Sequence, residues 1–382
     1  MIIVISVFIF LSTVVWFSTI GYALLLKMLR TPGSPLAWTP PTSPAKITVV
    51  IPTLNEAPAI DRKLANIRKA DYPFDRMEVL VVDGGSDDTT IERMQRQITQ
   101  GEPIRLIMMS GKPGKAAQVN RALEETNGDI IVVTDADSEW EPSCVARLAA
   151  HLAANPDTGV ISAVVRPRTC LGEERLHWAL LNWIWWLEGE AWSAPGLSGV
   201  CYAMRRSVFR KLSVSVQAED IHLALNVAAD GHRVRLCPQA VVWELRVPQT
   251  LREYLQFRLR RGSRYLEALR HQADIVSRRS PRARLTPRIR QWQMTYLPIL
   301  ALLTGILGVI LLASPYWPWP LGVITAMFFS AAPLVWEAHR LMGTEASGPD
   351  LKWLWSVMRW LSLTLVSLLC LPLQKTLKGV SP

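Results

Sequence analysis

Two carboxylates, Asp135 and Asp137, stand one residue apart just after a short apolar run, Ile130–Val133. Such a run is typical of a buried strand, and an open α/β sheet binds its ligands at the carboxyl ends of its strands. Two carboxylates with this spacing can share a hard cation such as Mg²⁺ or Mn²⁺, which prefers oxygen ligands. A solvated acidic turn has the same sequence, so the surrounding segments must decide between the two interpretations.

Three more strand-like runs precede the acidic pair, and a helical stretch separates each strand from the next. The strands are expected at 47–51, 78–82, 104–108 and 130–133, and the helices near 59–68, 89–97 and 116–125. The spacing of about 25 to 30 residues is that of parallel βαβ units. We therefore predict an α/β fold with a mostly parallel sheet, to which 160–165 adds a further strand.

Polar residues follow three of these strands. Glu56 comes after the first strand, Asp83 begins the polar segment 83–89 after the second, and the acidic pair follows the fourth. Because right-handed crossovers bring these strand ends to one side, residues about 80 positions apart should converge on one crevice. Segment 83–89 is also suited to a turn and a helix N-cap, and we expect it to serve both purposes.

A glycine-rich segment, Gly111–Lys115, begins the helix that precedes the acidic pair. It is not a Walker A motif, because Ala116 stands where that motif has the Ser or Thr that binds Mg²⁺. Lys112 and Lys115 could still bind a diphosphate at the helix start, where the helix dipole favours an anion. A solvated pair of lysines is the alternative.

The second half of the chain adds a Trp-rich stretch, a flexible loop and another acidic pair. Five of the sixteen Trp lie within 176–192, which suits a membrane interface, a wall for sugar rings or a core helix. Ser198 and Gly199 belong to a loop where a ligand can approach the backbone closely. Glu219 and Asp220 precede an apolar-periodic helix, where a carboxylate could act as a general base or cap the helix.

Both ends of the chain are apolar. Candidate membrane spans are 1–26, 294–313, 316–336 and 353–371. The segment 246–290 holds 13 Arg and no Lys against three acidic residues, which accounts for the whole net charge of +10. Since this basic segment adjoins an apolar block, it favours an anionic membrane surface as partner and not a nucleic acid. Arg359 interrupts the last span, which would then lie at the interface or pack against a polar partner.

These features divide the chain into five segments. They are an N-terminal transmembrane anchor (1–26), a Pro-rich connector (27–46), the sheet domain (47–245), a basic juxtamembrane segment (246–290) and a C-terminal region of about three transmembrane helices (291–382). With the N-terminus outside, four spans place the sheet domain in the cytoplasm. We expect an integral protein of a bacterial inner (plasma) membrane.

Six motifs occur in the order and approximate spacing of the family 2 glycosyltransferases, which the chain resembles from about residue 47 to residue 262. They are Ile51-Pro52-Thr53-x-Asn55-Glu56, Val82-Asp83-Gly84-Gly85-Ser86-x-Asp88-x-Thr90, Gly111-Lys112-x-Gly114-Lys115-x-x-x-x-Asn120, Asp135-Ala136-Asp137, Ser198-Gly199 and Glu219-Asp220. The membrane frame is similar to that of the hyaluronan, cellulose and poly-N-acetylglucosamine synthase branch. The resemblance implies a GT-A fold and an inverting transfer from a nucleotide-sugar donor, with a UDP-sugar expected.

The resemblance also implies a role for each motif. Asp137 would be the principal ligand of a divalent cation, Mg²⁺ or Mn²⁺, with Asp135 against the ribose or the metal. Asp220 would be the base that takes the proton of the attacking hydroxyl. The nucleoside and diphosphate would be held by Glu56, Asp83 and Lys115. Further residues expected at the substrates are Ser198, Gly199, Glu219, Gln256, Arg258, Arg260 and Arg261.

One motif of the processive members is altered. These members carry Gln-x-x-Arg-Trp after the base, whereas here Gln256 is followed at the corresponding positions by Leu259 and Arg260. Arg258, Arg260 and Arg261 could still hold the diphosphate, but the aromatic residue that caps the acceptor sugar is missing. We therefore expect transfer of one sugar to a lipid-soluble acceptor. The alternatives are a processive polysaccharide synthase with a glycan acceptor and a non-catalytic nucleotide-sugar-binding membrane protein.

Overall fold

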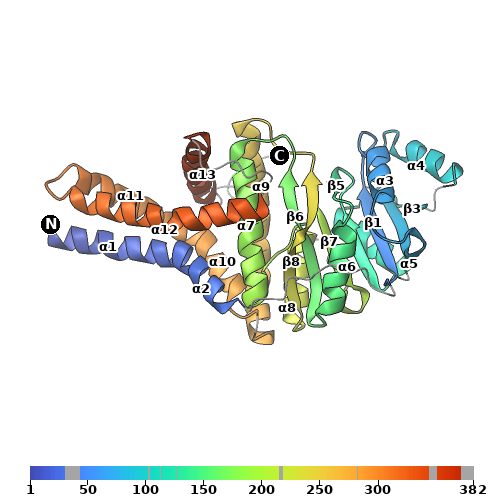
Figure 1. The fold of residues 1–382 in the computed structure, drawn as a ribbon, viewed down its shortest axis with the longest axis horizontal. Coiled ribbons are helices and arrows are strands. Elements are labelled where there is room, and N and C mark those ends of the chain that lie inside the picture. The colour runs from blue at the N-terminus through green and yellow to red at the C-terminus, as the bar shows by residue number, and fades with distance from the viewer. Residues whose placement is uncertain are drawn as a thin grey trace.

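The protein has a sheet domain at one end, a layer of long helices in the middle and a helical extension at the other end (Figure 1). The computed structural model describes residues 1–30, 44–101, 104–111, 113–126, 128–214, 218–281, 283–343 and 351–370. Most of the Pro-rich connector, Lys112 and the last twelve residues lie outside the described residues.

The first half of the sheet is the parallel array that the sequence predicts. Its strands are β1 (Ile47–Thr53), β2 (Met77–Asp83), β3 (Ile104–Met108) and β4 (Ile130–Thr134). They pair in parallel in the order β3-β2-β1-β4. Strands β1, β2 and β4 are rich in Val and Ile and almost wholly buried, as expected where helices cover both faces of a sheet. The predicted α/β fold is confirmed here.

The second half of the sheet is mixed, which the sequence did not indicate. Its strands are β5 (Ser138–Trp140), β6 (Thr158–Pro167), β7 (Cys201–Arg205) and β8 (Arg233–Glu244). Strand β7 lies antiparallel between β4 and β6, β6 is parallel to β8, and β5 is antiparallel to β8. Because Ser138 pairs with Glu244, the end of β8 lies beside the acidic pair.

Helices pack on both faces of the sheet. They are α3 (Ile60–Arg68), α4 (Thr90–Thr99), α5 (Lys115–Glu125), α6 (Cys144–Ala154) and α8 (Glu219–Ala229), with short 3₁₀ turns at Phe74–Arg76 and Arg206–Val208. The first three confirm the helices predicted between the parallel strands. A single buried apolar cluster runs from these helices through the sheet and into the helices that follow.

Two long helices, α7 (Gly172–Ala191) and α9 (Leu251–Arg279), form the layer between the sheet and the extension (Figure 1). Helix α9 begins at a capping box, in which the Thr250 side chain accepts from the Glu253 backbone N–H and the Glu253 carboxylate accepts in return. Helix α7 contacts β6 and β8 on one side and α2, α12 and α13 on the other. This layer therefore faces both the sheet and the extension.

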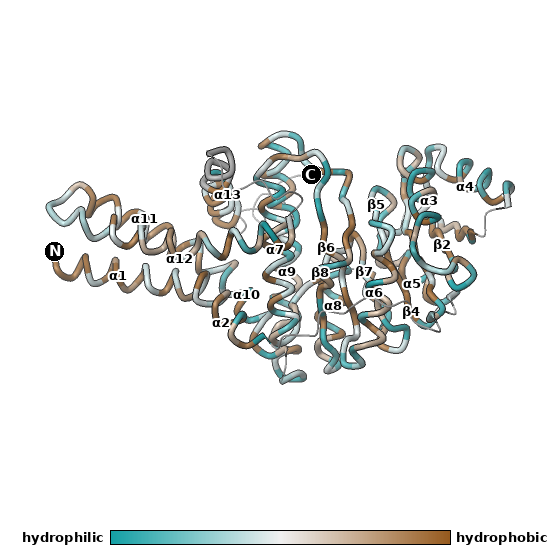
Figure 2. Tube along the Cα trace, in the orientation of Figure 1, coloured by the Kyte–Doolittle hydropathy of each residue, from teal (hydrophilic) through white to brown (hydrophobic). Residues whose placement is uncertain are grey.

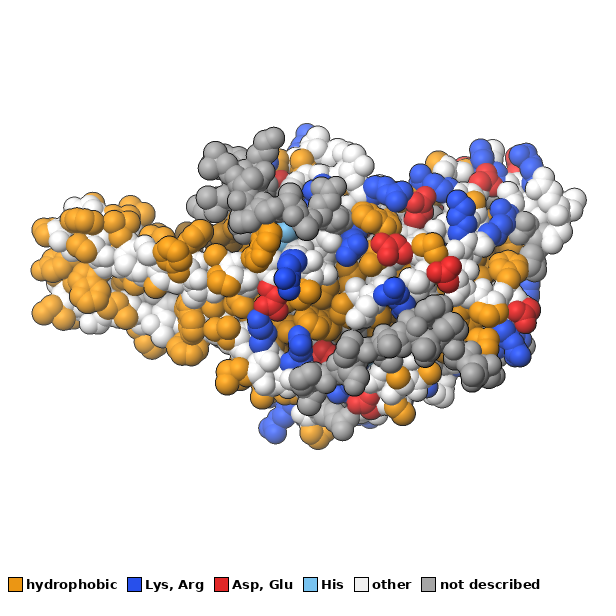
Figure 3. Space-filling model, viewed as in Figure 1, with side chains coloured by type: hydrophobic (Ala, Val, Ile, Leu, Met, Phe, Trp, Pro, Cys, Tyr) orange, Lys and Arg blue, Asp and Glu red, His pale blue; other side chains and the backbone are white. Residues whose placement is uncertain are grey.

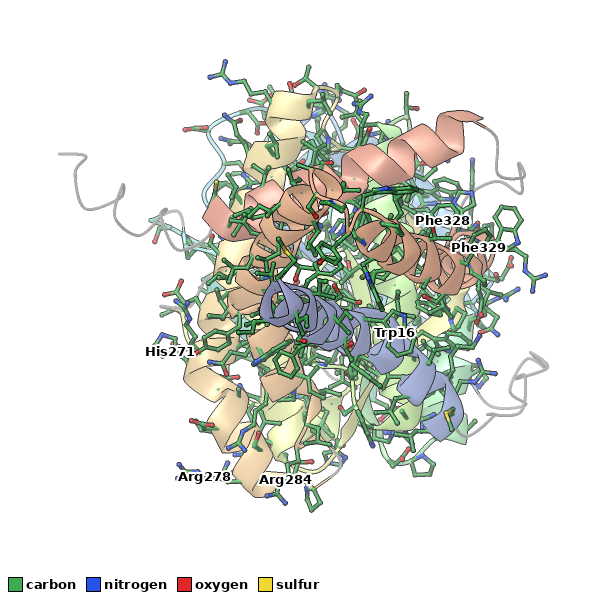
Figure 4. All side chains as sticks on the ribbon, turned by 90° about the vertical axis from the view of Figure 1, so that its left-hand side faces the viewer. Trp16, His271, Arg278, Arg284, Phe328 and Phe329 are labelled. Carbon is green, nitrogen blue, oxygen red and sulfur yellow. The ribbon has the colours of Figure 1, made fainter. Side chains whose placement is uncertain are left out.

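The extension is built from helices that, apart from Thr286–Thr295, are apolar. They are α1 (Ile2–Trp16), a π turn (Phe17–Gly21), α2 (Tyr22–Leu29), α10 (Thr286–Thr295), α11 (Leu297–Leu312) and α12 (Pro318–Met342). Hydrophobic residues run along its whole length in Figure 2, and on the face that Figure 3 shows they are frequent, whereas charged side chains gather nearer the sheet domain. Figure 4 looks along this extension: Phe328 and Phe329 point outward, whereas the Trp16 indole N–H donates to Ser330 Oγ at 2.9 Å.

The length and hydropathy of these helices suit a membrane. Two described helices, Ile2–Leu29 and Pro318–Met342, are long and apolar enough to cross one, and the pair α10 and α11, bent by 44°, would make a third. The last apolar helix, α13 (Leu351–Cys370), instead runs across the extension, seen end-on in Figure 1 and lengthwise in Figure 4. Its Arg359 forms a 2.8 Å ion pair with the buried Glu173 of α7, which is a polar partner of the kind expected.

Candidate active site

The carboxyl ends of β1 and β2 meet at Asp83, which is buried. Its Oδ1 accepts from the backbone N–H groups of Gly85 (2.9 Å) and Ser86 (2.8 Å), and its Oδ2 accepts from the hydroxyls of Ser86 (2.5 Å) and Thr53 (3.2 Å). These bonds fold the polar segment into a turn. In this structure Asp83 therefore holds the turn that follows β2, and its predicted contact with the nucleoside stays a prediction.

Arg246, from the segment after β8, links two of the predicted site residues. Its guanidinium donates to both oxygens of Glu56 at 3.0 and 2.8 Å, and its Nε lies 3.1 Å from Asp137 Oδ2. Burial raises the pKa of Glu56 and of Asp137, and the charge of Asp135 raises that of Asp137 further, whereas Arg246 opposes both shifts. The strand ends thus bring Glu56 and the acidic pair into one cluster, as predicted.

Lys115 joins the acidic pair to the second pair of acids. Its Nζ contacts Asp135 Oδ1 at 2.5 Å, the carbonyl oxygen of Gly199 at 2.9 Å and Glu219 Oε1 at 3.4 Å. Burial lowers the pKa of Lys115, but the charges of Asp135 and Glu219 outweigh it and raise that pKa above its ordinary value. The lysine at the start of α5 is therefore a fixed cation between the two acidic pairs.

Asp220, in the first turn of α8, is the acid best suited to proton transfer. Burial first, and the charge of Glu219 second, raise its pKa to about 7. Its Oδ1 accepts from the Ile221 N–H at 2.9 Å, and its Oδ2 lies so close to Gly199 that an added Cβ there would approach it to 2.9 Å. Only glycine at this position leaves the carboxylate where it is.

A cavity of about 620 Å³ begins at these acids and extends towards the membrane helices. At the sheet it is lined by Lys115, Asp135, Ser198, Gly199, Glu219, Asp220 and Glu244. Its middle is walled by α7 and α9, including Trp178, Trp183 and Trp185. At its far end it reaches Thr19 and Ala23 of the N-terminal span, Leu297 of α11 and Leu368 of α13. The Trp-rich stretch is thus a wall of this cavity.

Helix α9 presents only some of its predicted residues to the cavity. Arg258 and Arg261 line it, whereas Gln256 and Arg260 are exposed and are absent from its lining. The helical period explains this split, because residues three or four apart share a face and residues two apart do not. Arg261 contacts Glu244 and lies 3.6 Å from Glu174. Burial, opposed by the charge of Arg261 and assisted by that of Glu174, raises the pKa of Glu244 to about 7.

The carboxylate oxygens of Asp135 and Asp137 at the sheet edge are suitable ligands for a divalent cation. The described residues hold no cluster of three or more side chains that could bind a metal by itself. Asp135 and Asp137 are nevertheless close enough for the charge of Asp135 to raise the pKa of Asp137. Mg²⁺ and similar cations are commonly held by one or two carboxylates together with substrate phosphates, so this pair suffices if a diphosphate completes the shell.

Sequence reasoning missed three residues of this region. Glu244 ends a strand whose place in the sheet was not predicted, and Arg246 was assigned to the membrane-facing segment. The third is Lys63, which is buried beneath the acidic pair and donates to Thr134 Oγ1 at 2.7 Å and Ser138 Oγ at 3.0 Å. A signal for Lys63 existed, because it stands at a buried position on the apolar face of α3.

The profile of the family described as glycosyl transferase family 2 matches residues 48–213. The chain carries a family 2 glycosyltransferase domain. This domain holds the strands β1 to β4, the acidic pair and the loop of Ser198 and Gly199, while Asp220 and α9 follow it. The match confirms the family resemblance that the six motifs indicated.

Named relatives and a solved structure agree with this family 2 domain. The chain is 29% identical over 236 residues to the probable glycosyltransferase YdaM of Bacillus subtilis (strain 168), covering 58% of this chain and 56% of YdaM. It is 27% identical over 234 residues to an N-acetylglucosaminyltransferase of Rhizobium meliloti (strain 1021), covering 56% and 54%. The aligned region spans about half the length of these curated relatives.

The structure resembles the mannosyltransferase PcManGT from Pyrobaculum calidifontis, solved with GDP-Man and Mn²⁺. The TM-score is 0.69 at 26% identity, and the match covers 96% of this chain and 99% of that chain. The likeness therefore includes most of the helical extension as well as the sheet. It confirms the predicted GT-A fold.

Proposed function

We propose that this protein is an inverting glycosyltransferase that moves one sugar from a nucleotide-sugar to a hydroxyl of a membrane-soluble acceptor. The observation that carries the proposal is the cavity that joins Asp135 and Asp220 to side chains of the apolar extension. A water-soluble acceptor has no need of a path that ends at Ala23 and Leu368. A lipid acceptor needs such a path, because its chain stays among the apolar helices while its head reaches the acids.

The donor half of the site lies at the sheet edge. Its diphosphate would meet Lys115, and Glu56 and Asp83 would bind the nucleoside, as the family resemblance implies. Asp137, with Asp135, would hold a divalent cation, which supplies neutralisation of the negative charge that grows on the departing diphosphate. The relative PcManGT was solved with Mn²⁺, which supports the cation. In our proposal the sugar is carried by UDP. Because PcManGT was solved with GDP-Man, GDP-sugars must also be tested as donors.

Asp220 would act as the general base in a single displacement. The acceptor hydroxyl oxygen forms the new bond to the anomeric carbon, the bond from that carbon to the diphosphate oxygen breaks, and the hydroxyl proton passes to Asp220. A pKa of about 7 suits this task, because the carboxylate is largely ionised slightly above neutrality and still basic enough to accept a proton. No covalent enzyme intermediate is needed, and the configuration at the anomeric carbon inverts.

Charges at the base of the extension support a cytoplasmic sheet domain in the plasma membrane. At the end of the N-terminal span, Lys27 pairs with Glu337 of α12, and the Arg30 guanidinium lies 4.6 Å from the Trp186 ring centre. Basic residues and Trp gather at membrane interfaces, and basic residues favour the cytoplasmic side. We therefore propose that the sheet domain faces the cytoplasm of a bacterial cell.

The test is nucleotide release by the full chain purified in detergent. A panel of UDP- and GDP-sugars would be offered with Mn²⁺ or Mg²⁺, with and without a lipid extract of the source organism. We expect release that requires both metal and extract and that is lost in Asp137→Ala and Asp220→Ala. Release without lipid, with a growing polymer, would instead establish a processive synthase. No release with any donor would support a non-catalytic nucleotide-sugar-binding protein.

A further inference from the structure

The arginines of the cavity differ in how their charge is balanced. Arg261 contacts Glu244 and Glu174, and Arg290 donates to the buried Glu188 at 2.8 Å. Arg258, one turn before Arg261 on α9, forms no ion pair with a carboxylate of the described residues. Its guanidinium instead contacts the ring of His177 on α7 and lies 3.4 Å from the hydroxyl of Thr364 on α13.

Neither neighbour can neutralise Arg258. Burial, followed by the charges of Arg258 and Arg261, lowers the pKa of His177 well below its ordinary value, so the imidazole is neutral. Thr364 carries no charge. A guanidinium stays protonated at any physiological pH, and a charge withdrawn from water normally has an opposite charge beside it. Arg258 therefore lines the cavity as a cation with no ion pair to a described carboxylate; the nearby charge of Glu174, which also contacts Arg261, acts on it only from beyond ion-pair distance.

A second unpaired hydrogen-bond donor belongs to α13, the helix that Arg258 contacts. Trp360 lies one turn before Thr364 on α13 and also lines the cavity. Its indole Nε1 is buried and has no hydrogen-bond partner within the described part of the chain. Buried polar atoms in folded proteins are nearly always paired, so an unpaired N–H on a residue that lines the cavity indicates a missing acceptor. Arg258 and Trp360 together offer donors and a positive charge.

Arg258 and Trp360 are distinct from the residues proposed to bind the diphosphate of the nucleotide-sugar. In our proposal, the positive charge for that diphosphate comes from Lys115 and from the divalent cation that the acidic pair would hold at the sheet edge. Arg258 instead contacts α13, the helix that lies across the apolar extension. The cavity continues past it along apolar side chains, which are Leu180, Leu181, Ile184, Leu297 and Leu368. A molecule that fills this part is apolar at one end and anionic next to Arg258.

We propose that Arg258 and Trp360 bind the phosphate of the acceptor, which is a lipid whose hydroxyl-bearing head group is joined to its chain through phosphate. This inference rests on the proposed function and specifies its acceptor. The apolar chain lies against α7, α11 and α13, the phosphate lies between α9 and α13, and the hydroxyl extends towards Asp220. The guanidinium suits a phosphate because it offers parallel N–H groups to two oxygens.

The test compares two probes of equal chain length, farnesyl phosphate and farnesol, binding to the full chain in detergent. Binding is measured by isothermal titration, and the affinity of UDP and GDP with Mn²⁺ is measured on the same preparations. We expect wild-type protein to bind farnesyl phosphate at least about tenfold more tightly than farnesol. Arg258→Gln should remove this preference, Arg258→Lys should keep part of it, and nucleotide affinity should stay within about twofold in both.

Arg270→Gln is the matched control, since Arg270 is an exposed arginine on the same helix. It should retain the full preference for farnesyl phosphate. Equal binding of the two probes by wild-type protein would overturn the inference without any variant. Loss of nucleotide affinity in Arg258→Gln, with the lipid preference intact, would assign Arg258 to the donor diphosphate instead. If the proposed transferase activity is wrong but this inference is right, wild-type protein will prefer farnesyl phosphate and yet turn over no nucleotide-sugar.

Discussion

Replacing Asp220 by Asn removes the carboxylate that we propose as the general base. Burial and Glu219 raise the pKa of Asp220 to about 7, and only its ionised form accepts a proton. The ionised fraction is then about one in eleven at pH 6 and about ten in eleven at pH 8, so kcat/KM should rise about tenfold between them. Activity should therefore fall as the pH drops below about 7, because Asp220 becomes protonated there. An Asp with an ordinary pKa would become protonated only at a much lower pH.

The assay is initial-rate nucleotide release between about pH 5 and about pH 9 over a range of lipid concentrations, which gives both kcat/KM and kcat, for wild type and two variants. Asp220→Asn should lower kcat by about 10²- to 10⁴-fold and leave the residual rate independent of pH in this range. Glu219→Gln removes a charge that raises the pKa of Asp220, so the acid limb should move to lower pH. Circular dichroism would verify that both variants fold. A flat wild-type profile, or a limb that persists in Asp220→Asn, would refute this role of Asp220.

Three further changes test the arrangement of the site. Gly199→Ala places a Cβ 2.9 Å from Asp220 Oδ2, so kcat should fall by about 100-fold while the thermal midpoint stays nearly unchanged; unaltered turnover would show that the carboxylate has room to move. Asp137→Ala should abolish the rise in thermal midpoint that Mn²⁺ with UDP or GDP produces in wild type, and a retained rise would place the cation elsewhere. Arg246→Ala removes the ion pairs of the largely exposed Arg246 with Glu56 and Asp137. Mn²⁺ should then bind up to about fivefold more tightly, as measured by electron paramagnetic resonance. Weaker binding would indicate that Arg246 itself holds the anionic ligand.

The parallel half of the sheet was predictable because two signals in the sequence coincide. Strand-like runs of Val and Ile alternate with amphipathic helices at the spacing of βαβ units, and right-handed crossovers then fix the edge on which each strand ends. Glu56 and the acidic pair could therefore be placed together from sequence, and the structure links them through Arg246. The roles of these residues in binding and catalysis stay predictions.

The rest of the site depends on contacts that no local pattern reports. Strand β7 is five residues long and pairs with β4 only through tertiary structure, so neither it nor the position of Glu244 at the end of β8 could be placed. Arg246 was assigned to a basic membrane-facing segment by composition, whereas its ion pairs place it beside Glu56 and Asp137. The apolar run around Arg359 has the hydropathy of a span, but the ion pair with Glu173 holds it across the extension.

The most direct test of the proposed function is the chemical identity of the product. Full-length protein would be incubated with a radiolabelled nucleotide-sugar, the cation and the lipid extract, and the label would then be partitioned between organic and aqueous phases. We expect label in the organic phase, on a lipid whose mass has increased by one sugar residue, and no such product with Asp220→Asn. Label recovered only as a water-soluble polymer, or only as free sugar, would contradict transfer of a single sugar to a membrane-soluble acceptor.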